Sequence, residues 1–598
     1  MAYQETKKVR LQKLKGALEL ERSSFDSQAR EISQYILPRR TRFFTQDANR
    51  GNKRYTSIID STATMAAFTV GGGMVAGLTS PATPWFRLTV SNPEISERWG
   101  VKEWLDDVTD LMRTTLIQSN IYNSFPQVYT DVATFLTSAM LIEPDDEDVI
   151  ITQVFPFGSY YIAQDARKRV NVFMRRFQMT VRQIVDEFGR PDGPKGEIDW
   201  TNISDYCKQS WNDGQTERWI EVIHFILPNE EYKTGALESK YKRFSSCYYE
   251  NMSGGTQGGN VSSNGGIVQD NKYLRESGYD YFPVLCPRWS IVGEDVYGTD
   301  GPGTIAIGDA KALQVMHKRK AQAIEKQINP PMNATGQMRN AKLSVLPGEV
   351  NYLTPTNAKD GFAPAYLIQY NIEEMKEEIV AHQKRIQRAY HEDTFRMLIN
   401  DDRPQRATAA EIHAKQQEKM LDLGPVLEQL NQDMLDPLID IVFSIMLARG
   451  RSKANPFGMI PPPPKELFGM PLTVEYVSIM AQAQKANALG SYDRFASFVG
   501  QVAAVDPSIL DCVNRDKMVE HYGDMCGVKN DVLVDEEQVA AIRQARAKQQ
   551  AQQQQMAMLQ QATQSAKNLA QSPMDADEPN ALDKIVEGAR SNSLSNVA

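Results

Sequence analysis

The sequence is poor in cysteine and lacks the short motifs of several enzyme classes. Its 598 residues include five scattered cysteines and no Cys-x-x-Cys pair. This excludes a disulfide framework or a cysteine zinc site and favours folding in a reducing, intracellular place. Gly-Lys, His-Glu-x-x-His and Gly-x-Ser-x-Gly are also absent. We therefore expect no Walker A phosphate loop, no zincin, no α/β-hydrolase nucleophile and no cofactor, and hence a protein that is not an enzyme.

The chain also lacks a convincing membrane segment. Its N-terminal residues, MAYQETKKVRLQKLKG, contain no apolar core of the kind that a secretory signal needs. Residues 61–86 carry no charge and are long enough to cross a bilayer, but they include four glycines, five threonines and two prolines. That composition favours a small-residue helix buried between other helices over a membrane span.

The overall composition is globular with an acidic balance. Hydrophobic residues make up 41% and charged residues 24%, which excludes wholesale disorder. The length corresponds to roughly four domain-sized units. The 66 Lys and Arg against 75 Asp and Glu give a net charge of −9. A chain this acidic does not suit phosphate binding over its whole surface, although a local basic patch remains compatible with it.

Apolar spacing predicts a mainly α-helical fold with an α+β region. Helices are expected over residues 3–37, 99–140, 305–328, 370–393, 481–505 and 535–570, and from Thr408 to Gly450. Strands are expected over residues 85–90, 149–155, 170–177 and 219–227. The two helices 305–328 and 370–393 bracket a β-like insert, residues 329–369.

Local signals set the expected ends of several helices. Thr180-Val-Arg-Gln183 and Thr408-Ala-Ala-Glu411 each have the spacing of a capping box, in which the two side chains satisfy backbone N–H groups. In the helix from Thr408, Pro425 and Pro437 are expected to restart or kink the chain. The glutamine-rich helix 535–570 is followed by a tail, from residue 572, whose composition predicts disorder.

Two segments have both a chemical and a structural interpretation. Residues 145–148, Asp-Asp-Glu-Asp, could hold a divalent metal ion or form a solvated acidic turn, and charge runs favour the turn. Residues 301–306, GPGTIA, match a dinucleotide fingerprint formally. However, the acid near the right spacing, Glu325, lies inside a predicted helix, so a turn into that helix is favoured.

A third segment is basic. Helix 305–328 carries five cations that could contact nucleic-acid phosphates, namely Lys311, Lys318, Arg319, Lys320 and Lys326. The alternative is a solvated helix face whose counter-charges lie on a neighbour, and the sequence does not decide between the two.

A series of short motifs resembles the portal (head-to-tail connector) proteins of short-tailed bacteriophages, and the resemblance runs from about residue 10 to 505. No single motif is diagnostic, but their order and spacing are specific. They are Asp60-Ser-Thr62, Thr83-Pro-Trp-Phe86, Pro283-Val-Leu-Cys-Pro-Arg-Trp289, Tyr297-Gly298, Gly308-Asp-Ala-Lys311, Asn329-Pro-Pro331, Leu346-Pro-Gly348, Arg406-Ala-Thr-Ala-Ala-Glu411, Leu423-Gly-Pro425 and Ala481-Gln-Ala-Gln484.

The resemblance implies a portal fold assembled as a ring, with the following parts. They are N-terminal helices and an α+β wing (1–304), stem helices (305–328 and 370–393), a clip (329–369), a channel loop (394–407), wing and crown helices (408–534), a Gln-rich helix that could form a barrel (535–571) and a tail (572–598). Arg403 and Arg406 on the channel loop become candidate DNA contacts, together with Lys318, Arg319 and Lys320. Thr408 and Glu411 remain a helix cap.

The resemblance also implies a function in the virion. Twelve copies would form a ring at one capsid vertex, assembled in the host cytoplasm among capsid and scaffolding proteins. Terminase would drive double-stranded DNA through the channel without sequence specificity, and tail or adaptor proteins would dock later. Two other functions stay open at this point, a membrane-inserted pore that uses residues 61–86 and a metal-dependent nuclease that uses residues 145–148.

Overall fold

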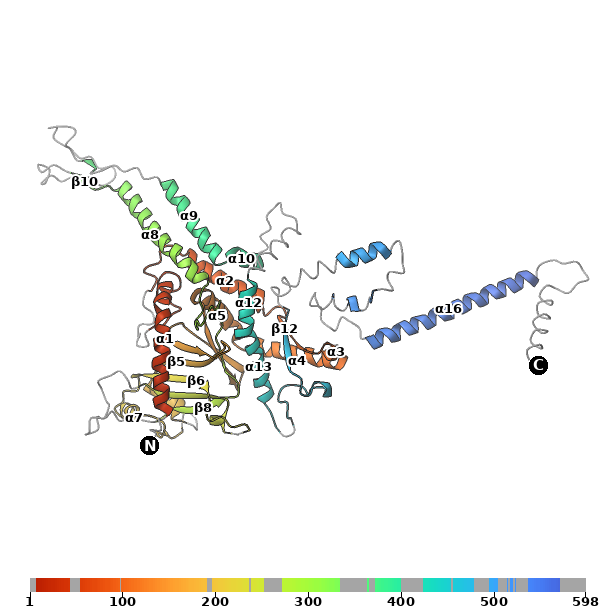
Figure 1. Cartoon of the computed structure of the whole chain (residues 1–598), viewed down its shortest axis with the longest axis horizontal. Helices are drawn as coiled ribbons and strands as arrows, with labels where there is room; N and C mark the ends of the chain where they lie inside the picture. The colour runs from red at the N-terminus through yellow and green to blue at the C-terminus, as the bar shows by residue number, and fades with distance from the viewer. Residues whose placement is uncertain are drawn as a thin grey trace, which may run out of the picture. The chain divides into compact units, whose positions relative to one another are not determined.

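The computed structural model divides the chain into two compact units, residues 1–497 and 498–598. The structure describes residues 7–43, 54–96, 98–190, 196–235, 238–251, 272–333, 363–364, 372–399, 423–452, 455–477, 494–503 and 536–570, with a few single positions between 513 and 522. Most of the described first unit is one body of helices and sheets, from which a pair of helices projects (Figure 1).

A five-stranded antiparallel sheet, in the order β4-β5-β6-β7-β8, forms one side of this body. Alternate residues of its strands point to opposite faces, as a pleated sheet requires. On β6, Val222 packs with helices α6 and α7, whereas Ile223 packs on the other face with Leu11 and Leu18 of α1. The elements are α1 (Lys7–Tyr35), β4 (Tyr160–Gln164), β5 (Val170–Thr180), α6 (Val181–Phe188), α7 (Asp205–Asn212), β6 (Trp219–Pro228), a 3₁₀ turn η1 (Ser239–Tyr241), β7 (Phe244–Glu250) and β8 (Arg275–Tyr279).

The capping box at Thr180 is confirmed. The Gln183 N–H donates to Thr180 Oγ1, and the Gln183 side chain accepts from the Thr180 N–H. These two bonds begin α6 where β5 ends, so the chain turns directly from the sheet into the helix that covers it. Gly189 ends α6, as its position in the sequence indicates.

The segment without charges, residues 61–86, provides the central helix of the body. Helix α2 (Thr62–Leu78) packs against α5 (Ile121–Phe135) and α10 (Glu392–Ile399). Its side chains at Ala66, Ala67 and Val70 are fully buried. Gly73 allows the close approach of Phe395 on α10, because a Cβ at this position would lie 2.5 Å from the Phe395 Cβ. The prediction of a small-residue helix buried between protein helices is confirmed.

The prediction of one helical stretch over residues 99–140 is wrong. The structure has α4 (Trp99–Gln118), α5 (Ile121–Phe135) and a strand, β2 (Ala139–Asp145). Strand β2 pairs with β3 (Val149–Phe155) and β9 (Val284–Leu285). Ser119 and Asn120 break the helix without interrupting its apolar spacing, and the run Ala-Met-Leu-Ile at 139–142 is buried in a sheet, an environment that periodicity does not distinguish from a buried helix.

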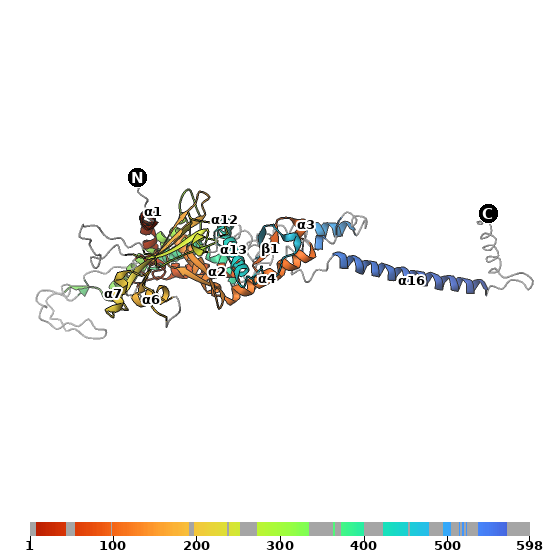
Figure 2. The same ribbon diagram turned by 90° about the horizontal axis from the view of Figure 1, so that it is seen from below.

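A second small sheet joins distant parts of the sequence. Strand β1 (Phe86–Val90) pairs antiparallel with β12 (Leu472–Tyr476), and it lies beside α3 (Pro93–Ser96) and α4 (Figure 2). The segment before β12 contains a short 3₁₀ turn, η4 (Lys465–Leu467). Pairing of Phe86 with Tyr476 therefore ties the N-terminal helices to the C-terminal part of the first unit.

The expected effect of Pro437 is also confirmed, whereas residues 408–422 of the predicted helix before Pro425 lie outside the described part of the chain. Pro425 lies in the first turn of α12 (Gly424–Leu430), and Pro437 lies in the first turn of α13 (Asp436–Ala448). Between them is a π-helical turn, η3 (Asn431–Leu435). Proline cannot donate the backbone hydrogen bond of a continuous α-helix, so the ladder is interrupted before Pro437.

In the second unit, α16 (Glu536–Ala570) forms as the spacing predicts. Large apolar side chains on it are exposed, namely Ile542, Met556, Met558 and Leu559. A helix also covers residues 494–503, inside the predicted range 481–505. The predicted disordered tail, from residue 572, lies outside the described residues.

The projecting helix pair as candidate functional site

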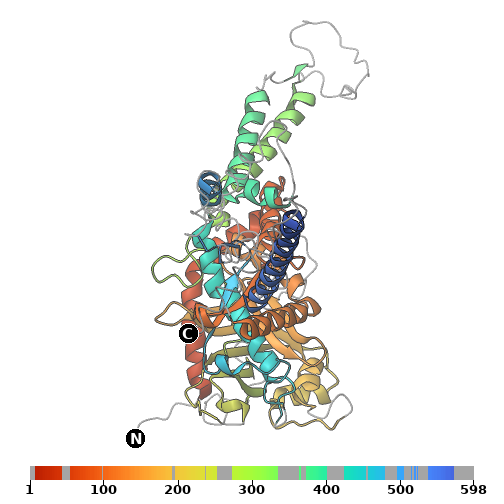
Figure 3. The ribbon, with the colours of Figure 1, turned by 90° about the vertical axis from the view of Figure 1, so that its right-hand side faces the viewer.

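Two antiparallel helices, α8 (Pro302–Ile328) and α9 (Ile372–Ala389), project side by side from the body (Figures 1 and 3). They are the pair that the spacing predicts at 305–328 and 370–393. At the far end of α8 the short strands β10 (Met332–Asn333) and β11 (Ala363–Pro364) pair with each other. Residues 334–362 and 365–369 of the predicted β-like insert lie outside the described part of the chain.

The segment 301–306 proves to be the start of α8. The Gly301 N–H donates to Thr304 Oγ1 (3.0 Å), and Pro302 occupies the first turn, where no N–H is needed. Gly303 is packed against the backbone of Thr134, where a Cβ would clash with the Thr134 carbonyl group. The glycines therefore serve helix packing, and this turn is buried rather than open to a nucleotide.

Apolar contacts hold the base of the pair against the body. Ala306, Ala310 and Leu313 of α8 are fully buried, as is Ile386 of α9. At the far end of α8, in contrast, Ile328 is 77% exposed. The two helices thus share one core at the base and reach beyond it at the tip.

Polar contacts fix the position of α8 along the axis of α9. Asp309 Oδ1 lies 2.7 Å from His382 Nδ1 and accepts from Arg385 Nε at 3.2 Å. Lys311 forms an ion pair with Glu31 of α1, so the base is also fastened to the N-terminal helix.

A second polar group centres on Asp60, in the loop before α2. Gln314 Oε1 accepts from the N–H groups of Ile59 (2.6 Å) and Asp60 (2.8 Å). Gln383 of α9 donates to Asp60 Oδ2 at 3.0 Å, and His317 Nε2 lies 3.3 Å from the same oxygen. One loop therefore contacts both helices. The sequence motif Asp60-Ser-Thr62 marks this loop, but no local pattern pairs it with α8 and α9.

Of the predicted basic site, three residues lie on the projecting half of α8. Lys318 and Arg319 are exposed, whereas Lys320 is half-buried. The pKa of Glu373 on α9 is lowered, first by its hydrogen bond to Lys376 and then by further positive charge that includes Lys320. Lys320 thus lies close enough to α9 to stabilise an acidic side chain there.

At the base of the pair, helix α10 changes one expected boundary. His391, at a φ of 51°, separates α9 from α10 (Glu392–Ile399), and Phe395 of α10 is buried under α2. The predicted channel loop 394–407 therefore begins with six helical residues. Arg403, Arg406, Thr408 and Glu411 lie outside the described residues.

The acidic segment 145–148 is a turn between β2 and β3. Asp145 Oδ2 accepts from the N–H groups of Glu147 (3.0 Å) and Asp148 (2.9 Å), and these bonds lower the Asp145 pKa. Arg449 donates to the carbonyl groups of Asp145 and Asp146. Over the ranges that the structure describes, no group of three or more His, Cys, Asp or Glu side chains could hold a metal ion.

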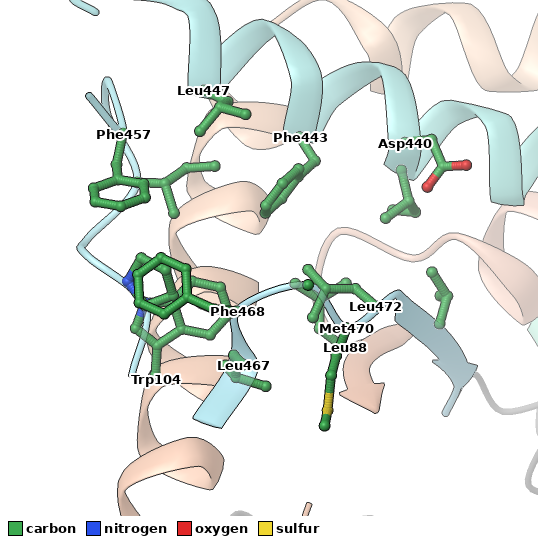
Figure 4. Close-up of a pocket in the computed structure, with 15 residues that line it drawn as sticks. Leu88, Trp104, Asp440, Phe443, Leu447, Phe457, Leu467, Phe468, Met470 and Leu472 are labelled. Carbon is green, nitrogen blue, oxygen red and sulfur yellow. The ribbon is translucent and has the colours of Figure 1, made fainter. Parts of the chain in front are cut away.

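An apolar pocket of about 420 Å³ lies between α13, α4 and the β1–β12 pair (Figure 4). Trp104, Phe443, Phe468 and Leu472 point into it, and Asp440 is the single ionisable residue in its lining. Burial raises the pKa of Asp440, with Asp436 adding to the shift. A lone carboxyl without a second acid, a histidine or a cation in the lining does not form a catalytic site.

The comparisons with known proteins agree with this architecture. The sequence profile of the family described as "Bacteriophage head to tail connecting protein" matches residues 8–533. The chain belongs to this family.

Two curated relatives of this head-to-tail connecting protein cover almost the whole chain. The chain is 43% identical over 585 residues to the "Portal protein" of Salmonella phage epsilon15. The matched region covers 98% of this chain and 99% of the relative. The chain is 38% identical, with the same coverage, to the "Probable portal protein" of Bordetella phage BPP-1. Within its described residues, this portal-family chain has no helix long and apolar enough to cross a membrane.

Proposed function

We propose that twelve copies of this chain form a closed ring at one capsid vertex, with a central channel for genome packaging and ejection. Family membership and the names of the two relatives support this function. The single structural observation that carries it is the pair α8 and α9, which is anchored at its base by Asp309, Asp60 and Lys311 and projects beyond the body. Such a helix pair is suited to form one subunit's part of a channel wall.

The parts of the portal are assigned as follows in this proposal. Residues 1–304 form the N-terminal helices and the wing, and residues 408–534 form the wing and crown helices. Helices 305–328 and 370–393 form the stem, and residues 329–369 form the clip. Because α10 extends to Ile399, the range assigned to the channel loop is shortened to residues 400–407. Arg403 and Arg406 contact DNA from this loop. The exposed apolar residues of α16 support a barrel formed by the Gln-rich helices 535–571.

The partners follow from the same proposal. Terminase binds the clip during packaging, and tail or adaptor proteins bind later. Capsid and scaffolding proteins surround the wing in the host cytoplasm, where the virion assembles. The protein itself acts as a structural ring without catalytic activity. Double-stranded DNA passes without sequence-specific contacts, and it can slide because an acidic chain does not form deep phosphate traps.

The test is the native mass of the purified protein together with electron micrographs of the same sample. Twelve copies of 67.3 kDa give about 808 kDa, the mass of a closed cyclic assembly. We expect a ring with a central hole near this mass. A stable monomer or dimer at all concentrations would refute the proposal.

A further inference from the structure

The projecting half of α8 and the facing end of α9 carry opposite charges. Between residues 318 and 326, α8 has four basic residues and one acidic residue. Between residues 373 and 378, α9 has four acidic residues and one basic residue. Only part of this charge is neutralised inside the chain. Over the described residues, no ion pair or hydrogen bond is found for Lys318, Arg319, Glu374 or Glu377.

Both helices also present an outward stripe in which residues recur three and four apart. On α8 the outward stripe consists of Ile305, Gly308, Ala312, Val315, Arg319, Gln322 and Lys326, which are exposed except for the half-buried Ala312. On α9 it consists of Glu374, Glu377, Ala381, Lys384 and Arg388, all exposed. This spacing keeps each set on one helix face, as in a helix that packs along another helix.

The α8 stripe has an apolar, small-residue base that is open to a neighbour. Ile305 is 63% exposed and Val315 is 48% exposed. Between them, a Cβ added at Gly308 would meet no atom within 4 Å. On α9 the adjacent Val380 is 45% exposed. A second helix could therefore approach closely at this height and bury these side chains.

The contacts inside one chain show which residues of α8 and α9 lie at the same level along the helix pair. Asp309 is level with His382 and Arg385, and Lys320 is close enough to influence Glu373. By the same register, Arg319 is level with Glu374, and Ala312 is level with Val380 and Ala381. For a helix pair that runs along the ring axis, rotation about that axis leaves the level of each residue unchanged, so adjacent copies present these residues to each other at matching levels.

We propose that the outward stripe of α8 packs against the outward stripe of α9 on the next copy in the ring, so that Arg319 of the stripe and the exposed Lys318 beside it pair with Glu374 and Glu377 of that copy. The inference rests on the proposed ring and identifies its partner surface as a second copy of this chain. It also reassigns Lys318 and Arg319, which the sequence places among candidate DNA contacts, to a contact between subunits. Each exposed ion pair is weak, but the contact repeats at every interface.

The test uses two charge-reversed variants of the full-length chain. The first is Lys318→Glu with Arg319→Glu, which leaves acidic residues at both 318–319 of α8 and 374/377 of α9. The second is Glu374→Lys with Glu377→Lys, which leaves basic residues at both places. Lys320 and Glu373 stay unchanged, so the charge interaction between them within the chain is kept. We expect each variant alone to give a several-fold smaller ring fraction than the unaltered chain, measured by native mass at moderate salt.

Mixing the two variants separates a contact between copies from one within a chain. In an alternating ring the acidic end of α8 in one variant meets the basic end of α9 in the other, so the mixture should give a larger ring fraction than either variant alone. Repair within a chain cannot produce this result, because each chain still carries two helices of like charge. The matched control, Arg182→Glu with Lys240→Glu, changes two exposed cations away from the pair and should assemble normally.

The outcomes distinguish the inference from the proposed function. An unaltered chain that stays monomeric would refute the ring itself. Normal rings from both variants, or a mixture that assembles no better than its components, would refute the stripe contact and leave the ring intact. Normal rings that lose packaged DNA only when Lys318 and Arg319 are reversed would show that these residues contact DNA instead.

Discussion

Arg288 and Asp433 form a two-bonded ion pair in the interior of the body. Arg288 Nε donates to Asp433 Oδ2 at 2.9 Å, and Nη2 donates to Oδ1 at 3.0 Å. The Arg288 side chain is 0% exposed and donates in addition to Gln164 and to the Lys168 carbonyl group. Asp433 lies in the π-helical turn before Pro437, so the irregular turn carries the carboxylate that holds the segment after β9 in place.

Replacement of Asp433 by alanine should reduce the free energy of unfolding by about 3–5 kcal/mol, because a buried guanidinium would lose its counter-charge. Thermal unfolding of the full chain measures the effect. The matched control is Glu217→Ala, which removes an exposed pair with Arg182 and should cost about 0–1 kcal/mol. Similar losses in both variants would contradict the role of burial.

Two neighbouring glycines of α2 should respond to alanine in opposite directions. A Cβ at Gly73 would lie 2.5 Å from the Phe395 Cβ, which rotation of the phenyl ring cannot relieve. We therefore expect Gly73→Ala to destabilise the protein by about 1–3 kcal/mol. A Cβ at Gly72 would meet no atom within 4 Å, so Gly72→Ala should stabilise the helix by up to about 1 kcal/mol.

Melting temperatures of the two variants, measured under the same conditions, check this prediction. An unchanged or higher melting temperature for Gly73→Ala would show that α10 does not pack on α2 in this way. Destabilisation by Gly72→Ala would show that another part of the chain, or another copy, covers that face of α2.

The stability of the body should depend on pH through Asp131. This residue is buried beside Arg40, whose guanidinium donates to both carboxylate oxygens at 2.8 and 2.7 Å. Burial outweighs the arginine and raises the Asp131 pKa from 3.8 to about 6. Between these values the unfolded chain has lost the proton and the folded chain has kept it, so this contribution to stability falls as pH rises from about 4 to 6.

Asp131→Asn removes the titration while keeping the shape of the side chain. We expect the melting temperature of the unaltered chain, relative to that of the variant, to fall across this pH range and to stay level above it. Unfolding scans of both proteins from pH 4 to pH 7 measure the difference. Parallel curves would mean that Asp131 titrates at a similar pH in the folded and unfolded chains.

The sequence predicts those features that local contacts determine. Apolar spacing places α1, α8 and α9 within a few residues of their observed ends, and the capping box at Thr180 is formed by residues only three apart. Pro425 and Pro437 act on their own helix turns. In each case the residues that provide the signal are also the ones that make the contact.

Contacts between distant segments could not be predicted in this way. The pairing of Phe86 with Tyr476 and the ion pair of Arg288 with Asp433 leave no periodic trace in either segment. The same holds for Asp60, which contacts both helices of the candidate site. The break at Ser119 and Asn120 could not be predicted for a different reason. The apolar spacing of α4 continues into α5, so no change of pattern marks the end of the first helix. A turn is required only after α5, where strand β2 follows.

The final prediction concerns the arginines assigned to the channel loop. Arg403→Ala with Arg406→Ala should leave ring assembly intact and alter DNA packaging or retention, because in the proposed channel these two cations attract DNA phosphates in an otherwise acidic protein. Packaged genome length and DNA loss from filled heads measure the effect in phage that carry the variant. Arg403→Lys with Arg406→Lys keeps both charges and should behave normally, since the contacts are to phosphates rather than to bases. If the alanine variant packages and retains full-length DNA as the unaltered protein does, these residues do not contact DNA in the channel.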